Sequence, residues 1–161
     1  MIKQLLTALL FGLAGCGSPE GSRLAPDFTL PDLTGKTLSL SSMRGKPVLI
    51  NFWASWCESC REEMPALEAL HRRLSGSGAV ILGVSLDENA VSVVPPFVKT
   101  HQLTFPILMA DKHAADGYAV RGLPTAYLID SEGFIAKRWV GPLDVRAVEN
   151  DILALLKRRQ P

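Results

Sequence analysis

The chain has 161 residues, of which 47% are apolar, so it can bury the core of one ordinary domain, and wholesale disorder is excluded. Its 17 basic and 16 acidic residues nearly cancel, which gives no electrostatic case for a nucleic-acid partner. Three cysteines are too few for a disulfide scaffold, and the odd count indicates that one of them has a different role from the other two.

The first segment, MIKQLLTALLFGLAGC, is typical of an export signal. It has a positive start at Lys3 and an apolar run that is too short to span a bilayer, which takes about 20 residues. Its end, LAGC at 13–16, resembles the lipobox of bacterial lipoproteins. The resemblance implies cleavage before Cys16 and attachment of lipid to its sulfur. We therefore expect a signal peptide at 1–15, followed by the lipidated Cys16 and a flexible tether, together spanning 16–26.

Strands and helices alternate after the tether. Two extended pieces, 27–30 and 36–40, flank a turn and predict a small hairpin. The apolar run 47–54 predicts a strand buried on both faces, and the helical spacing of apolar residues predicts a helix over 58–74. A second buried strand at 79–86 completes a right-handed βαβ unit.

The second half of the chain is less regular. Pro95-Pro96 predict the start of a short helix that runs through His101, and an extended stretch and a short helix follow at 105–110 and 112–120. Residues 125–130 and 134–140 predict a β-hairpin, and 144–158 predict a final amphipathic helix. We therefore expect one α/β domain over 27–161, with a central mixed sheet flanked by helices.

Cys57 and Cys60 stand at the junction between the first buried strand and the helix that follows it. Residues three apart on a helix share a face, so the two sulfurs could bond with little movement of the backbone. Cys57 would meet unpaired N–H groups and the positive end of the helix dipole, which favour its thiolate, whereas the neighbouring Glu58 opposes ionisation. The pattern predicts that Cys57 attacks a partner's disulfide and that Cys60 resolves the mixed disulfide.

The motifs WCESC (56–60), REEMP (61–65) and GLPT (122–125) resemble the thioredoxin superfamily. The stretch from APDFTL at 25–30 to the first cysteine of the pair is similar to the TlpA/ResA-like group of membrane-tethered thioredoxins, and the likeness covers 25–158. The resemblance implies a thioredoxin-like fold with an N-terminal hairpin and a central insertion at 87–111. It also implies a thiol–disulfide oxidoreductase that reduces specific protein disulfides, for example in cytochrome c maturation.

The same resemblance assigns roles to single residues. Pro124 matches the family's cis-proline, and Leu123 would offer its backbone to a substrate strand. Trp56 would shape the docking surface, and Glu88 matches a buried acid that could move protons during exchange. Ser59 stands where many members carry proline, so the family's redox potential and partner choice are not carried over.

These predictions imply a set of partners and a location. The clients are proteins with disulfides, and an upstream membrane thiol–disulfide reductant is needed because the chain has no second cysteine pair. The bilayer is contacted through Cys16, so the domain works in an extracytoplasmic space such as the periplasm. No metal is expected, and no cofactor other than the Cys57–Cys60 disulfide.

Four other interpretations stay open. A permanent staple would close only a four-residue loop and would stabilise little. Copper-carrying thioredoxin folds use cysteines with three intervening residues and a distal histidine, whereas the spacing here is two. A peroxiredoxin-like peroxidase needs a proline ahead of its cysteine, which FWASWC at 52–57 lacks. A lipoprotein domain that only docks a partner would not need the intact pair.

Overall fold

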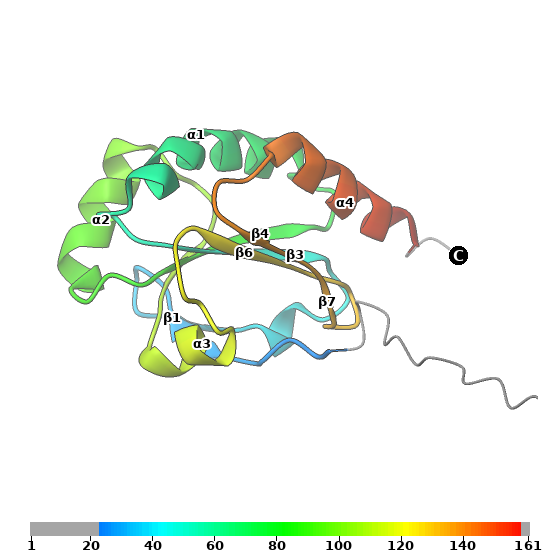
Figure 1. Cartoon of the computed structure of the whole chain (residues 1–161), viewed down its shortest axis with the longest axis horizontal. Helices are drawn as coiled ribbons and strands as arrows, with labels where there is room; N and C mark the ends of the chain where they lie inside the picture. Colours follow the sequence, from blue (N-terminus) through cyan, green and yellow to red (C-terminus); the bar gives the residue numbers. More distant parts are fainter. Residues whose placement is uncertain (1–22, 159–161) are drawn as a thin grey trace, which may run out of the picture.

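A computed structural model describes residues 23–158 and places a five-stranded sheet at the centre of the molecule (Figure 1). The strand order is β5-β4-β3-β6-β7. The first three of these run parallel: β3 (Val48–Trp53), β4 (Val80–Ser85) and β5 (Ile107–Met109). β6 (Thr125–Ile129) and β7 (Ile135–Val140) are antiparallel, so the sheet is mixed as predicted.

Helices cover both faces of this sheet (Figure 1). One face carries α1 (Glu58–Arg73), α2 (Ala90–Thr100) and α4 (Val145–Arg158). The other face carries α3 (Lys112–Gly117) and the predicted hairpin of β1 (Thr29–Pro31) and β2 (Thr37–Ser39), which a 3-10 helix at Ser41–Met43 follows. Among the described residues, no helix has the length and apolar character that crossing a bilayer requires.

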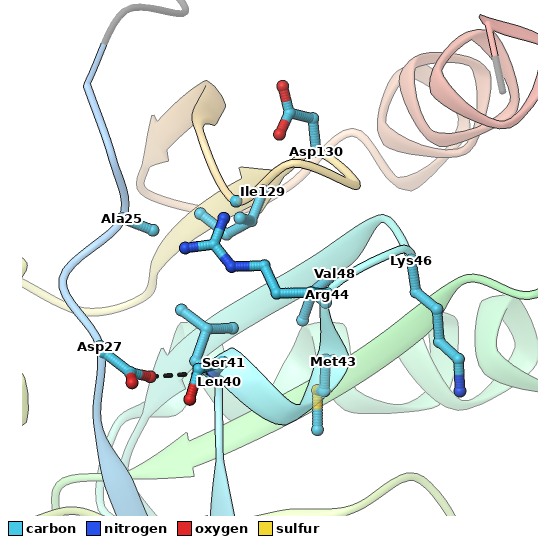
Figure 2. Close-up of a pocket in the computed structure, with 11 residues that line it drawn as sticks. Ala25, Asp27, Leu40, Ser41, Met43, Arg44, Lys46, Val48, Ile129 and Asp130 are labelled. Atoms are coloured by element: carbon cyan, nitrogen blue, oxygen red, sulfur yellow. Dashed lines mark hydrogen bonds between the residues drawn. The ribbon is translucent and has the colours of Figure 1, made fainter.

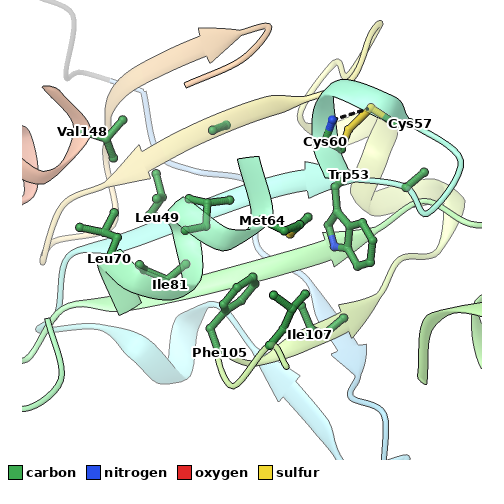
Figure 3. Packing of buried hydrophobic residues seen from close by; sticks show 14 of the residues in the cluster. Leu49, Trp53, Cys57, Cys60, Met64, Leu70, Ile81, Phe105, Ile107 and Val148 are labelled. Carbon is green, nitrogen blue, oxygen red and sulfur yellow. Dashed lines mark hydrogen bonds between the residues drawn. A yellow bond between two sulfur atoms is a disulfide. The ribbon is translucent and has the colours of Figure 1, made fainter. Parts of the chain in front are cut away.

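β3 lies at the centre because both of its faces are buried. Successive side chains of β3 point to opposite faces of the sheet and enter two separate apolar cores. Leu49 and Trp53 pack against the layer of α1, α2 and α4, as Figure 3 shows, while Ile50 and Phe52 pack under the hairpin and α3. The strand is therefore held from both sides, which fixes the position of whatever follows its last residue.

The insertion helix α2 begins five residues before the proline pair at which the sequence predicted its start. Ala90, Val94 and Val98 recur at a spacing of four, and all of them contribute to the apolar cluster of that face. Packing of this stripe stabilises the turns upstream of Pro95 and Pro96, which the helix contains. The prediction of a helix that begins at the prolines is therefore wrong at its N-terminal end.

The folded part of the chain also starts earlier than predicted. Residues 23–26 were assigned to the tether, but Leu24 pairs with Phe134 and the N–H of Ala25 donates to the carbonyl of Gly133 at 2.9 Å. Ala25 is buried against the sheet, so these residues extend the domain. The predicted signal peptide, Cys16 and the rest of the tether lie outside the described residues.

Candidate active site

Cys57 and Cys60 are joined by a disulfide, with Cα atoms 5.2 Å apart, at the start of α1. The bond forms because β3 ends at Trp53 and a tight turn follows, in which the N–H of Cys57 donates to the carbonyl of Ala54 at 3.1 Å. α1 begins directly after this turn, which brings Cys60 one helical turn from Cys57. The predicted pairing at a strand–helix junction is confirmed.

Cys57 is the N-cap residue of α1. Its backbone is extended, and its sulfur accepts the N–H of Cys60 at 3.2 Å, one of the four donors that a helix leaves unpaired at its start. The hydroxyl of Ser59 lies 3.6 Å from the same sulfur. Cys57 is 7% exposed and Cys60 is fully buried, so only the first cysteine of the pair has contact with solvent.

Trp56 projects into solvent beside the pair, with 71% of its surface exposed. It separates two clefts. One, of about 410 Å³, runs toward Leu86, Glu88 and Val93, and the other, of about 480 Å³, runs toward Glu62 and His101. An exposed indole next to a reactive disulfide fits the predicted docking role better than that of a core tryptophan.

Leu123 and Pro124 lie at the same end of the sheet as the cysteines. Thr125 is paired with Phe52, so Pro124 stands beside the end of β3 from which the active-site turn departs. The Leu123–Pro124 peptide bond is cis, as the GLPT motif predicted. Leu123 is half-buried, and the carbonyl of Pro124 accepts the N–H of Gly141 at 2.9 Å.

Glu88 is exposed, so the burial expected for this acid is wrong. The buried carboxyl after β4 belongs to its neighbour Asp87, which is 8% exposed. Asp87 is short enough to accept hydrogen bonds from Ser55 and Ser85 within the fold, whereas the side chain of Glu88 reaches the cleft beside Trp56. A role for Glu88 in proton transfer stays a prediction.

A second buried acid, Glu63, was not singled out from the sequence. It lies on α1 three residues after Cys60, on the same face of the helix, and is 7% exposed. Its carboxylate accepts Asn51 Nδ2 at 2.9 Å and the N–H of Leu143 at 3.2 Å. Burial raises the pKa of Glu63, although the bonds from Leu143 and Asn51 act in the opposite direction. A proton-accepting group is therefore present within the apolar layer behind the cysteine pair.

A small cavity lies at the other end of the sheet, between Ala25, Arg44 and Asp130 (Figure 2). Its volume is about 10 Å³, which corresponds to roughly a single water-sized sphere. It is therefore too small for a substrate, and the clefts on either side of Trp56 are the spaces available near the cysteines.

The sequence and the fold match known proteins along most of the chain. Residues 22–138 match the model of the AhpC/TSA family. The chain belongs to the AhpC/TSA family. It is 39% identical to the thioredoxin-like protein YneN of Bacillus subtilis over 137 residues, which is 84% of this chain and 80% of YneN. It is 35% identical to the thiol-disulfide oxidoreductase ResA of the same organism, over 86% of this chain and 76% of ResA.

The chain also shares its fold with solved structures. A thiol:disulfide interchange protein from Chlorobium tepidum has a TM-score of 0.76 and 26% identity, over 83% of this chain and 96% of that protein. The ResA-like group and the thioredoxin-like fold predicted from the sequence are thereby confirmed.

Two of the three histidines of this ResA-like chain, His71 and His101, pack against aromatic rings. The ring of His101 stacks on Phe97 at 4.1 Å between centroids, and that of His71 meets Phe105 edge-on at 6.1 Å. Within residues 23–158, no three His, Cys, Asp or Glu side chains are gathered so as to hold a metal ion. Copper carriage therefore gains no support from the described part of the chain.

Proposed function

We propose that this protein reduces disulfides of specific client proteins outside the cytoplasm, with Cys57 as the attacking thiol and Cys60 as the resolving thiol. The enzyme class, a thiol–disulfide oxidoreductase, is established by the family together with the redox pair. The observation that carries the assignment of roles is the position of Cys57 as the N-cap of α1. Cys57 has contact with solvent there, while Cys60 is fully buried.

The exchange proceeds in two balanced steps. The Cys57 thiolate attacks one client sulfur, so that the client's S–S bond breaks and its other sulfur leaves as a thiolate. Cys60 then loses its proton and attacks the Cys57 sulfur, which forms the Cys57–Cys60 bond and releases the first client sulfur. The client gains two electrons and two protons, and the pair is left oxidised.

Glu63 is the group placed to accept the proton of Cys60. The two residues are one turn apart on the buried face of α1, and Glu63 lies in the apolar layer that excludes water from Cys60. A carboxylate whose pKa is raised by burial holds a proton better than an exposed one, which suits it to take a thiol proton and return it. We therefore propose Glu63 for the proton-transfer step, and the role that the resemblance implied for Glu88 stays a prediction.

Reduction of the pair requires an upstream thiol donor. The chain has no further cysteine besides Cys16, which we propose carries lipid. A membrane thiol–disulfide reductant is the partner that this arrangement needs, and cytochrome c maturation is one pathway that the resemblance to the TlpA/ResA-like group implies for the clients.

Anchoring through Cys16 would hold the active site away from the bilayer. The carbonyl of Arg23 accepts the N–H of Ile135 at the start of β7, the end of the sheet opposite Cys57. β3 alone separates the two ends by about 20 Å, and seven residues from Cys16 to Arg23 reach at most about 25 Å. Replacing Cys16 with serine should release the chain into the soluble extract, and retention in washed membranes would exclude this anchor.

Trapping tests the assignment of roles in the reaction. In cells that express Cys60→Ser, clients should accumulate as mixed disulfides through Cys57, and mass spectrometry would identify them. Cys57→Ser is the matched control and should trap far less. Equal trapping by both variants would contradict the proposed roles, and rapid peroxide consumption without disulfide reduction would favour the peroxidase interpretation.

A further inference from the structure

Asp87 is a buried carboxylate to which the exchange reaction assigns no task. It follows β4 by two residues, is 8% exposed and forms no ion pair within residues 23–158. Acids are seldom so buried unless their oxygens are fully paired. Here Oδ1 accepts Ser55 Oγ at 2.6 Å, and Oδ2 accepts the N–H of Ser55 at 2.9 Å and Ser85 Oγ at 2.8 Å. The N–H of Ser55 and the two serine hydroxyls can all donate to the acid, so both of its oxygens have partners.

These bonds attach the end of β4 to the turn that presents the nucleophile. Ser55 is the second residue of the turn closed by the N–H of Cys57 and the carbonyl of Ala54. A further bond, from the N–H of Leu86 to the carbonyl of Trp53 at 2.8 Å, joins the same two segments. Asp87 therefore holds Ser55, the residue directly before the exposed Trp56. Through Ser55 it also holds the backbone turn that leads to Cys57.

We propose that Asp87 is a positioning residue for the attack by Cys57 and that it places a fixed negative charge behind the active-site turn. The proposal rests on the role of Cys57 in the proposed function. Ser55 and Cys57 are two residues apart, at most about 7.6 Å between Cα atoms, and the Asp87 carboxylate is bonded to Ser55, so its charge lies on the order of one Debye length from Cys57. The charge opposes formation of the thiolate, while the hydrogen bonds hold the turn in its reactive shape.

Other titratable groups surround Cys57, and they are the same in all of the variants compared below. α1 contributes Glu58, Arg61 and Glu62 on its exposed side and Glu63 on its buried side. Around them on neighbouring segments lie Glu88 and His101. None of them accepts a hydrogen bond from Ser55 among the described residues, so only Asp87 combines a charge with control of the turn.

Two substitutions separate the charge from the hydrogen bonds. Asp87→Asn removes the charge and leaves one acceptor oxygen in place, whereas Ser55→Ala removes one bond and keeps the charge. Glu132→Gln, at the β6–β7 turn on the far side of the sheet, is a charge control. The readout is the pH dependence of iodoacetamide alkylation in the reduced full chain, measured by mass spectrometry on the peptide that contains Cys57.

Asp87→Asn should increase the thiolate fraction of Cys57 at pH 7 by about threefold. It should also lower the rate at which the Cys57 thiolate, once formed, attacks the disulfides of native insulin. Ser55→Ala should lower that rate with an unchanged pH profile, and Glu132→Gln should match the wild type. An unchanged pH profile in Asp87→Asn would overturn the charge effect, and an unchanged insulin rate in Ser55→Ala would overturn the positioning.

The two hypotheses can fail separately. Alkylation of Cys57 is measurable even if the wild type reduces no protein disulfide, and that result would count against the proposed function alone. If Asp87→Asn does not fold, Ser55→Ala and Ser85→Ala still test the hydrogen bonds, because each should slow attack on insulin while the pH profile stays that of the wild type.

Discussion

Glu63 offers a sharp test because its buried carboxylate accepts two hydrogen bonds and, within residues 23–158, forms no ion pair. Glu63→Ala leaves Asn51 Nδ2 and the N–H of Leu143 without an acceptor. An unpaired buried donor costs about 1–3 kcal/mol, so this variant, which leaves two, should lose on the order of 2–6 kcal/mol of unfolding free energy. Glu63→Gln keeps an oxygen for Leu143, and its amide N–H can donate to Asn51 Oδ1, which has no partner among the described residues.

The glutamine variant should therefore remain folded and should change the pH dependence of stability. Burial raises the pKa of Glu63 above its ordinary 4.5, so the folded protein binds this proton more tightly than the unfolded chain does. The stability that protonated Glu63 contributes is present below its ordinary pKa of 4.5 and is lost as the pH rises through its raised pKa in the folded protein. Glu63→Gln has no such loss, so its advantage over the wild type should grow as the pH rises above about 4.5 and through the raised pKa of Glu63.

Urea unfolding of the oxidised full chain at a series of pH values measures both effects. With Cys60 intact, the same glutamine variant should also slow resolution of the mixed disulfide between Cys57 and a client, because Cys60 would lack its proton acceptor. A difference between Glu63→Gln and wild type that stays constant with pH, together with an unaffected rate of resolution, would refute the reasoning about this acid.

Three further predictions concern other parts of the chain. A methyl group at Gly83 would stand 2.6 Å from Ile107 Cδ1 in the core, so Gly83→Ala should cost about 1–3 kcal/mol, and an unchanged melting temperature would contradict this. Trp56→Ala should alter stability by less than about 0.5 kcal/mol yet slow reduction of insulin more than that of a small aromatic disulfide, whereas equal slowing would count against docking. Burial acts to raise the pKa of Glu68, but hydrogen bonds, chiefly from Thr104, lower it to about 2. The stabilisation that the Glu68 carboxylate contributes is present above pH 4.5 and is lost as the pH falls toward about 2. Glu68→Gln should therefore unfold at a lower urea concentration than the wild type at pH 6, and the two midpoints should converge near pH 2.

The central strands and the cysteine pair could be predicted because local pattern and packing agree there. The apolar run at 47–54 can be satisfied only by a strand buried on both faces, and β3 is buried throughout. The two-residue spacing of the cysteines at a helix start brings their sulfurs together without any distant contact. These features depend on neighbours in the sequence, which is why they could be read from it.

The acids could not be placed in the same way. Asp87 and Glu88 are adjacent, and which of them turns inward depends on the hydroxyls of Ser55 and Ser85, which come from separate segments. A signal for Glu63 did exist, since it continues the buried stripe of Cys60, Leu67 and Leu70 on α1. Asn51, which donates to Glu63, is the one polar residue between Val48 and Ala54. Only the packing of α1 on β3 shows that the two side chains meet.

The difference between the two thiols is the central claim, and it is tested most directly by alkylating the reduced full chain across a pH series. Mass spectrometry follows Cys57 and Cys60 separately. We predict that Cys57 reacts first and that the buried Cys60 stays protected. Equal rates at the two sulfurs, or faster reaction at Cys60, would contradict the assignment of Cys57 as the attacking thiol.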